Sequence, residues 1–150
     1  MLKNNIIEKQ EICKLIPHDG LMCLLDKVIE WDEKRIICCS ETHQSADNPL
    51  RNDQGLPVTA LIEYGAQAMA IHGGLLANKY HQVIHESYLA SLRNVSIDEA
   101  GDVSSIKTML YIEAIQHMSS QGNMIYTFSI KANQRKLVSG RATVIAVINN

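Results

Sequence analysis

Glu63 is the residue of this sequence whose surroundings most clearly require a chemical explanation. It lies within residues 57–77, PVTALIEYGAQAMAIHGGLLA, a run that is apolar on nearly every side and predicts one buried helix. Thr59, Glu63 and Gln67 recur every four residues, so a regular helix would place them on one narrow stripe. An ionised carboxylate is costly in such a place unless it is paired or lines a cavity. Burial favours the neutral acid, which can donate a proton.

The rest of the chain supplies the strands that such a helix needs for burial. Residues 7–16 have the periodicity of a short amphipathic helix, which Pro17 ends. Alternating apolar and polar residues predict a hairpin and then, after the helix, four more strands: 21–31 with 35–42, then 88–97, 104–116, 123–132 and 136–148. We therefore expect one domain, residues 1–150, of the α+β class. In it, one long helix over residues 59–77 is wrapped by an antiparallel sheet of about six strands.

Composition and charge exclude several classes of function. Lys and Arg number 14 against 16 Asp and Glu, and no basic run occurs, so a nucleic-acid partner is disfavoured. Glu63 and Gln67 interrupt the apolar run, which falls short of the roughly 18 apolar residues of a membrane span. Residues 1–15 lack the apolar core of a signal peptide, so we expect a cytoplasmic protein.

The four cysteines, Cys13, Cys23, Cys38 and Cys39, show no zinc-ligand spacing. Adjacent Cys38 and Cys39 would point to opposite faces of a strand. We expect all four to be free thiols that behave as small core hydrophobes in a reducing compartment, and we expect no metal site.

Two segments resemble the hotdog-fold 3-hydroxyacyl-ACP dehydratase family. IPHDGLMCLLDKV (16–28) is similar to the family's Leu-Pro-His-Arg-x-Pro-(Phe/Met)-Leu-Leu-(Val/Leu)-Asp-(Arg/Glu)-Val segment. GLPVTALIEYGAQ (55–67) is similar to its Pro-Gly-Val-Leu-x-x-Glu-(Ala/Tyr)-Met-Ala-Gln central helix. Tyr64 behind a Gly-x-Pro loop, together with YLASLR (88–93), resembles the aryl-polyene-type dehydratase subgroup most closely. The motifs cover roughly residues 12–97.

The resemblance implies loss of water from a 3-hydroxyacyl thioester to give the 2-enoyl thioester, in fatty-acid or polyene-type lipid biosynthesis. The substrate would be carried on the phosphopantetheine of an acyl carrier protein or of coenzyme A, with no metal or diffusible cofactor. In the family, a helix carboxylate protonates the departing hydroxyl, a histidine takes the C2 proton, and backbone N–H groups polarise the thioester carbonyl. Glu63 maps onto the carboxylate and Gln67 onto the glutamine one turn later. Pro57 and Thr59, at the start of this helix, are expected with Gln67 to bind the substrate or to support Glu63.

The family's histidine has no counterpart here. It belongs to a Gly-His-Phe-Pro loop fourteen residues before the carboxylate, and that position is Pro49. His18 is the first candidate for the base, because a turn can aim its imidazole into a cleft. His43, which opens the loop before the helix, is the second. His72 falls on the far side of the helix from Glu63 and is expected to be a core group with satisfied hydrogen bonds.

Two other functions remain open on this fold. One is an acyl thioesterase in which Glu63 activates water for attack on the thioester. The other is a non-catalytic acyl-binding or assembly partner that has lost the usual histidine. Members of the family form dimers whose sheets join edge to edge, which implies a homodimer or a higher oligomer in which an exposed edge strand is covered.

Overall fold

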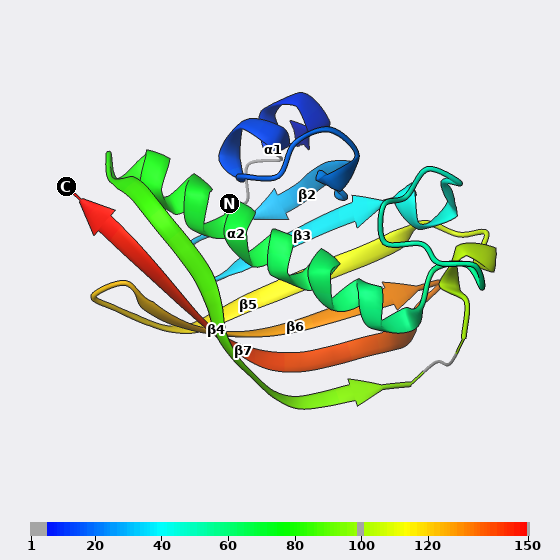
Figure 1. The fold of residues 1–150 in the computed structure, drawn as a ribbon. Coiled ribbons are helices and arrows are strands. Elements are labelled where there is room, and N and C mark those ends of the chain that lie inside the picture. The colour runs from blue at the N-terminus through cyan, green and yellow to red at the C-terminus, as the bar shows by residue number, and fades with distance from the viewer. Residues whose placement is uncertain (1–5, 99–100, 150) are drawn as a thin grey trace.

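A computed structural model describes residues 6–98 and 101–149 of the chain (Figure 1). The elements in chain order are β1 (Ile7–Glu8), α1 (Lys9–Leu15), the 3₁₀ turn η1 (Gly20–Met22), β2 (Lys27–Trp31), β3 (Arg35–Ser40), η2 (Thr42–Gln44), η3 (Val58–Ala60), α2 (Leu61–Lys79), β4 (Val83–Ile97), η4 (Val103–Ser105), β5 (Leu110–Ser120), β6 (Asn123–Ala132) and β7 (Arg135–Asn149).

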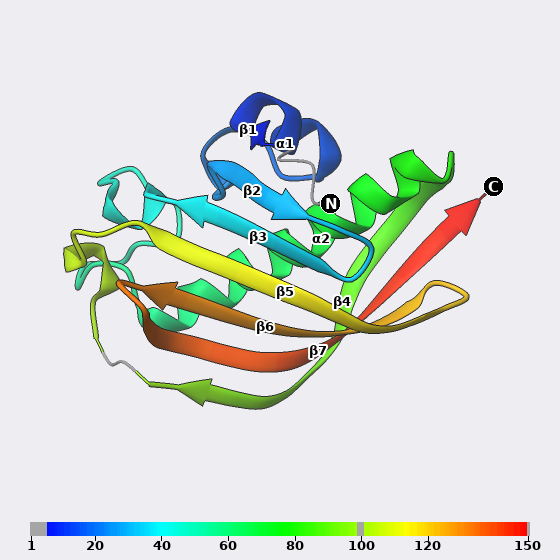
Figure 2. The ribbon, with the colours of Figure 1, turned by 180° about the vertical axis from the view of Figure 1, so that it is seen from behind.

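The strands form one antiparallel sheet in the order β1-β2-β3-β5-β6-β7-β4. Helix α2 lies across one face of this sheet, and the view from behind shows the strands in front of it (Figure 2). This is the expected hotdog arrangement, but the sheet has seven strands rather than about six. The additional strand, β1, has only two residues, which is too short to show an alternating pattern.

The core lies between α2 and the sheet. Alternate residues of β6, including Tyr126 and Phe128, are buried against the helix, as the period of two in a strand requires. Gly65 of α2 lies directly over the Phe128 ring, so that a Cβ added there would be 2.7 Å from Phe128 Cδ2. Gly74 lies close to α1, since an added Cβ would be 3.2 Å from the Leu15 carbonyl oxygen. The two glycines therefore set how near α2 lies to its neighbours.

Several element boundaries differ from the expected ones. The helix expected over residues 59–77 continues through Gly73 and Gly74 to Lys79. Strand β4 begins at Val83, before the start of the strand expected over residues 88–97. β4 is an edge strand and pairs only with β7 among the described strands. Because its other edge has no neighbouring strand there, β4 tolerates polar residues. Residues 103–105 form a 3₁₀ turn, and β5 starts only at Leu110.

The expectation of four free thiols is wrong. Cys13 and Cys23 form a disulfide whose Cα atoms are 6.0 Å apart. The turn that follows Pro17 folds the chain back, so the segment after η1 passes the end of α1 within disulfide reach. Cys38 and Cys39 are free and buried, as expected.

Candidate functional site

His18 and Glu63 meet at the open side of α2. The Nε2 atom of His18 lies 3.1 Å from Oε1 of Glu63, and about one third of each side chain is exposed. Glu63 is in the first turn of α2, and His18 lies in the turn between α1 and η1. The Nδ1 atom of His18 is buried and has no hydrogen-bond partner among the described residues. The Nε2 side of the imidazole is therefore the one that faces the carboxyl group.

Gln67 connects this pair to the chain that carries His18. Its side chain is fully buried. The Nε2 amide donates to the Met22 carbonyl over 2.7 Å and to Glu63 Oε1 over 3.3 Å, while Oε1 accepts from the Leu24 N–H over 2.9 Å. One amide thus orients the carboxyl group one turn away, as expected, and fixes the strand entry behind His18 to α2.

Tyr64 links the loop before α2 to α2 itself through hydrogen bonds. Its hydroxyl lies 2.7 Å from Thr42 Oγ1 and accepts from Asn48 Nδ2 over 2.9 Å. The Asn48 amide also donates to the Thr42 carbonyl over 3.0 Å. Burial raises the pKa of Tyr64, against the opposing effect of these hydrogen bonds, so the phenol stays neutral and serves as an anchor.

Asp102 holds the segment that leads directly into η3. Its Oδ1 accepts from the Leu56 N–H over 2.9 Å, and the Leu56 carbonyl accepts from Val103 N–H over 2.8 Å. The Ser104 hydroxyl and the Leu56 N–H hold the pKa of Asp102 below its usual range. Gly55 has φ +105° and lies against this carboxylate, where any Cβ would be 2.3 Å from Cγ. Nothing local in the sequence links residues 55 and 102, and sequence analysis missed this contact.

Pro57 and Thr59 lie at the helix start, but Thr59 does not continue the stripe of Glu63 and Gln67. Thr59 lies in η3, a 3₁₀ turn, and its side chain is exposed. Because a 3₁₀ turn has about three residues per turn rather than 3.6, the four-residue spacing no longer keeps Thr59 on that side. The Pro57 carbonyl accepts from the Ala60 N–H over 2.9 Å and starts this turn.

The remaining histidines are placed differently. His43 is fully buried in η2, with Nε2 3.0 Å from the Ile106 carbonyl, and burial lowers its pKa. No hydrogen bond or ion pair joins His43 to Glu63 within the described parts of the chain. His72 is a core group with both nitrogens bonded, as expected: Nε2 lies 2.8 Å from the Asp32 carbonyl and Nδ1 lies 2.7 Å from the Tyr126 hydroxyl. The structure thus brings His18, and not His43, to the carboxyl group.

A groove of about 870 Å³ lies along the later part of α2, and neither His18 nor Glu63 is among the residues that line it. One wall contains Ile16 and Pro17, directly before His18, and the floor contains Ala70 and Gly74. At about 100° per residue, both floor residues project within about 20° of the direction of Glu63. The other walls come from β1, α1 and the beginning of β4: Ile7, Glu11, Lys14, Leu15, Val83, Ile84, His85, Glu86 and Ser87. The groove therefore has an apolar part formed by Ile16, Pro17 and Ala70, and mixed apolar and polar walls on α1 and β4.

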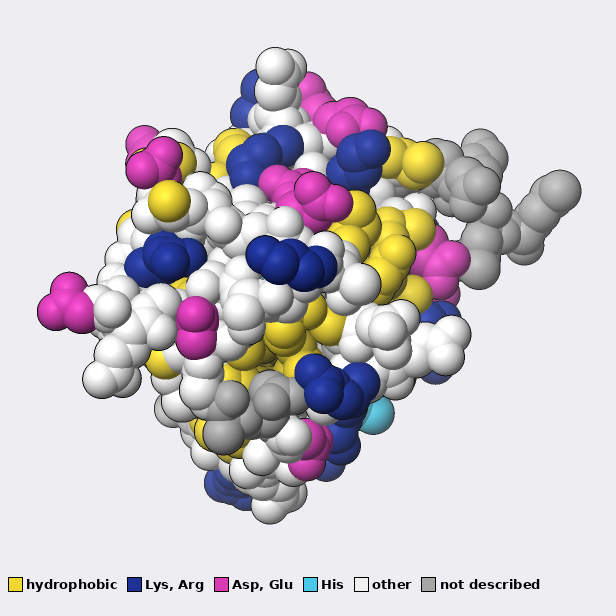
Figure 3. All heavy atoms as spheres, turned by 90° about the vertical axis from the view of Figure 1, so that its right-hand side faces the viewer, with side chains coloured by type: hydrophobic (Ala, Val, Ile, Leu, Met, Phe, Trp, Pro, Cys, Tyr) yellow, Lys and Arg dark blue, Asp and Glu magenta, His cyan; other side chains and the backbone are white. Residues whose placement is uncertain are grey.

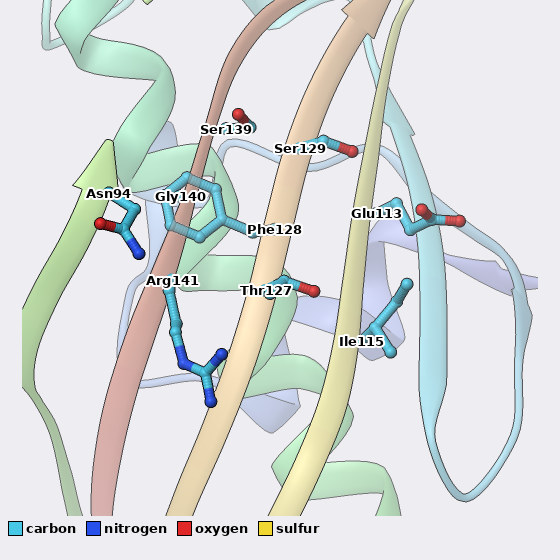
Figure 4. Close-up of a pocket in the computed structure, with 9 residues that line it drawn as sticks. All are labelled: Asn94, Glu113, Ile115, Thr127, Phe128, Ser129, Ser139, Gly140 and Arg141. Carbon is cyan, nitrogen blue, oxygen red and sulfur yellow. The ribbon is translucent and has the colours of Figure 1, made fainter. Parts of the chain in front are cut away.

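A second hollow, of about 350 Å³, is formed by the strands alone (Figure 4). Figure 4 shows side chains from β4, β5, β6 and β7, among them Thr127 and Ser129, which alternate with the core-facing residues of β6. None of the residues expected at the site lines it. It therefore lies apart from Glu63 and His18.

The end of the molecule that carries the loop before α2 has mixed charge. Figure 3 shows Lys and Arg side chains interspersed with Asp and Glu, and hydrophobic side chains between them. Within residues 6–98 and 101–149, no group of three or more His, Cys, Asp or Glu side chains could hold a metal ion. No helix in this part of the chain has the length and apolarity to cross a bilayer.

Known proteins resemble this chain over most of its length. A family model described as ApeP-like, ApeP dehydratase, matches residues 10–149. The dehydratase heterocomplex ApeI:P from Xenorhabdus doucetiae matches with a TM-score of 0.80 and 22% identity, covering 91% of this chain and 90% of that chain.

More distant structures share only the fold. The E. coli PaaI protein from the phenylacetic acid degradation operon has a TM-score of 0.62 and 12% identity, covering 91% of this chain and 88% of that one. A thioesterase from Staphylococcus aureus has a TM-score of 0.59 and 12% identity, covering 79% and 90%. No curated protein sequence matches the chain. Since the family model spans nearly all of its residues, the chain belongs to the ApeP-like dehydratase family.

Proposed function

We propose that this chain dehydrates 3-hydroxyacyl thioesters, with Glu63 as the acid and His18 as the base. The observation that carries the proposal is the 3.1 Å contact between His18 Nε2 and Glu63 Oε1. The reaction needs one group that accepts the C2 proton and one that donates a proton to the hydroxyl at C3. The contact puts both groups at one place, although Pro49 occupies the position of the family's usual histidine.

The same contact closes the proton cycle. Neutral His18 accepts the C2 proton at Nε2, and the C2 electron pair forms the new double bond as the C3–O bond breaks. The carboxylic acid of Glu63 gives its proton to the departing hydroxyl, and water leaves. An imidazolium and a carboxylate then face one another within hydrogen-bond reach, so a single proton transfer from Nε2 to Oε1 restores both groups.

The groove along α2 supports an acyl substrate. Its apolar part begins at Ile16 and Pro17, beside His18, and continues over Ala70 and Gly74. We propose that the acyl chain lies there, while the thioester sits at the helix start, where α2 leaves N–H groups without intrahelical partners. The thioester would be carried on the phosphopantetheine of an acyl carrier protein or of coenzyme A, and no metal or diffusible cofactor takes part.

The open edge of β4 supports assembly with a second hotdog subunit. β4 is 15 residues long, and its exposed side chains include Tyr88, Leu89 and Leu92. An unpaired edge of this length and apolarity is normally covered in native proteins. We propose a homodimer through β4, which light scattering would detect as twice the chain mass of 16.7 kDa. If the chain alone is a monomer and a larger species forms only when a homologous chain is added, the assembly is a heterocomplex and not a homodimer.

Product analysis tests the proposed reaction. Purified protein is incubated in parallel with a 3-hydroxyacyl-ACP and with a saturated acyl-ACP, and the products are identified by mass spectrometry. Formation of the 2-enoyl thioester from the first substrate supports a dehydratase. Release of free acid and free carrier thiol from the second indicates a thioesterase instead, and binding without turnover of either indicates a non-catalytic acyl-binding partner.

Glu63→Gln tests the acid within the same assay. The amide keeps the shape of the side chain but cannot donate the carboxylic proton, so we expect turnover to fall by about 10²–10⁴-fold. Glu113→Gln is the matched control, because Glu113 is another carboxylate that is about one third exposed, but it pairs with Arg35 and lines the other hollow. Equal turnover in Glu63→Gln and Glu113→Gln would remove Glu63 from the mechanism.

A further inference from the structure

The Cys13–Cys23 disulfide encloses the segment that carries His18. Cys13 is in α1, Cys23 follows η1, and the two are ten residues apart in sequence, with His18 midway between them. The Nδ1 atom of His18 has no partner in the described residues, and the contact with Glu63 is the polar contact that holds its ring. The position of the imidazole is therefore set by the backbone of residues 13–23, which the disulfide closes into a loop, rather than by a second hydrogen bond.

The two ends of the loop that the disulfide closes are held by different kinds of contact. Gln67 bonds to the Met22 carbonyl and to the Leu24 N–H, the two neighbours of Cys23, and so ties this end to α2. The other end lies on α1, which has seven residues and no side-chain cap at its N-terminus and is held by packing, with Ile12 fully buried and Leu15 against Gly74. If the disulfide is opened, the Gln67 hydrogen bonds still hold the Cys23 end against α2. The covalent link between Cys23 and α1 is lost.

We propose that Cys13–Cys23 is a redox modification site, and that a dithiol reductant opens it and loosens the contact between His18 and Glu63. The side chain of Cys13 is partly exposed, whereas that of Cys23 is 1% exposed. A thiolate of the reductant therefore attacks Sγ of Cys13, and Cys23 leaves as a thiolate that takes up a proton. The second thiol of the reductant then displaces Cys13, so the reductant becomes a disulfide and the protein gains two thiols.

The free cysteines supply an internal control. Cys38 and Cys39 are buried on β3, and burial raises the pKa of both thiols, which keeps them protonated and unreactive. In the folded protein, an alkylating reagent should therefore label Cys13 and Cys23 only after reduction and should leave the β3 cysteines unlabelled in both states.

The first arm of the test locates the disulfide. Protein equilibrated with oxidised glutathione, with or without later dithiothreitol, is treated with iodoacetamide and mapped by peptide mass spectrometry. We expect a 13–23 cross-link before reduction and two alkylated cysteines after it. Absence of the cross-link in the oxidised sample would overturn the proposal.

The second arm measures the coupling of His18 to Glu63 by NMR without any substrate. The change in the His18 imidazole chemical shift caused by Glu63→Gln is compared in oxidised and reduced protein. We expect it to be at least about twofold larger in the oxidised state, in the manner of a double-mutant cycle. The Cys13→Ser/Cys23→Ser double variant should show the smaller value with or without dithiothreitol, and Cys38→Ser should respond as the parent chain does. Equal coupling in both redox states would overturn the proposal.

The effect on turnover rests on the proposed dehydratase function, but these two arms do not. If the cross-link and the redox-dependent coupling are observed while no enoyl thioester forms in either state, the redox site stands and the dehydratase proposal fails. If the oxidised protein forms the enoyl product faster than the reduced protein and than the Cys13→Ser/Cys23→Ser variant, both proposals are supported.

Discussion

The Leu24 N–H donates to Oε1 of Gln67 over 2.9 Å, and this bond joins the segment behind His18 to the helix that carries Glu63. The same amide donates to the Met22 carbonyl over 2.7 Å. Two backbone groups of a loop are thereby satisfied by one buried side chain, so Gln67 positions Glu63 and the segment that carries His18 relative to each other.

Gln67→Leu should uncouple these parts and destabilise the fold. It leaves the Leu24 N–H and the Met22 carbonyl without their partner, at about 1–3 kcal/mol for each group. We expect the free energy of unfolding in urea to fall by about 2–4 kcal/mol, whereas Gln44→Leu at an exposed position should change it by less than about 0.5 kcal/mol. Similar values for the two variants would show that the Gln67 bonds are not important for stability.

His18→Ala and His43→Ala should fail in different ways. Loss of His18 removes the base, so we expect turnover to fall about 10²-fold or more while the melting temperature stays close to that of the parent. His43 is buried and bonded to the Ile106 carbonyl, so its loss should lower the melting temperature and leave the remaining folded protein active. His117→Ala, at an exposed position that contacts Thr127, is the control for both assays. The reverse pattern would make His43 the base.

Stability should fall as the pH is lowered through the titration of His72 and His43. Burial depresses the pKa of both imidazoles below the value near 6.5 of the unfolded chain, so the unfolded state binds protons first. The stability that the neutral groups contribute is fully present above about pH 6.5 and is lost as the pH falls through the folded-state pKa. A proton on Nδ1 of His72 would also reverse the hydrogen bond with Tyr126, so that the Tyr126 hydroxyl accepts instead of donating.

The measurement is the free energy of unfolding between about pH 8 and pH 5, where each histidine contributes up to about 1.4 kcal/mol per pH unit. His72→Gln should flatten this dependence, although it lowers stability overall. An unchanged slope in His72→Gln would show that His72 does not titrate on unfolding in this range.

Two glycines of α2 should respond to alanine with opposite signs. In Gly65→Ala the new Cβ would lie 2.7 Å from the Phe128 ring, which Gly140 confines from the other side, so we expect a loss of about 1–3 kcal/mol. In Gly73→Ala the nearest atom is Ile84 Cδ1 at 3.9 Å, so the better helix propensity should stabilise the protein by up to about 1 kcal/mol. Urea unfolding of both variants checks the prediction. A stable Gly65→Ala protein would mean that α2 can move away from β6.

The local patterns of the sequence determined the main parts of this protein. The apolar run around Glu63 predicted α2, alternation predicted most of the strands, and the two motifs predicted the fold and the family. These features depend on residues close together in the chain, so the periodicity and turn residues of a segment predict its secondary structure directly. β1 and the early part of β4 were not predicted as strands, because neither shows an apolar alternation of its own.

Only the tertiary structure decided which side chains meet. His18 and His43 were both candidates, and the choice depends on how Gln67 and the Cys13–Cys23 disulfide hold the turn that carries His18 against α2. Thr59 left the expected stripe because the helix begins with a 3₁₀ turn. Such contacts join residues far apart in the chain, and their geometry follows from the packing of whole elements, which no local periodicity encodes.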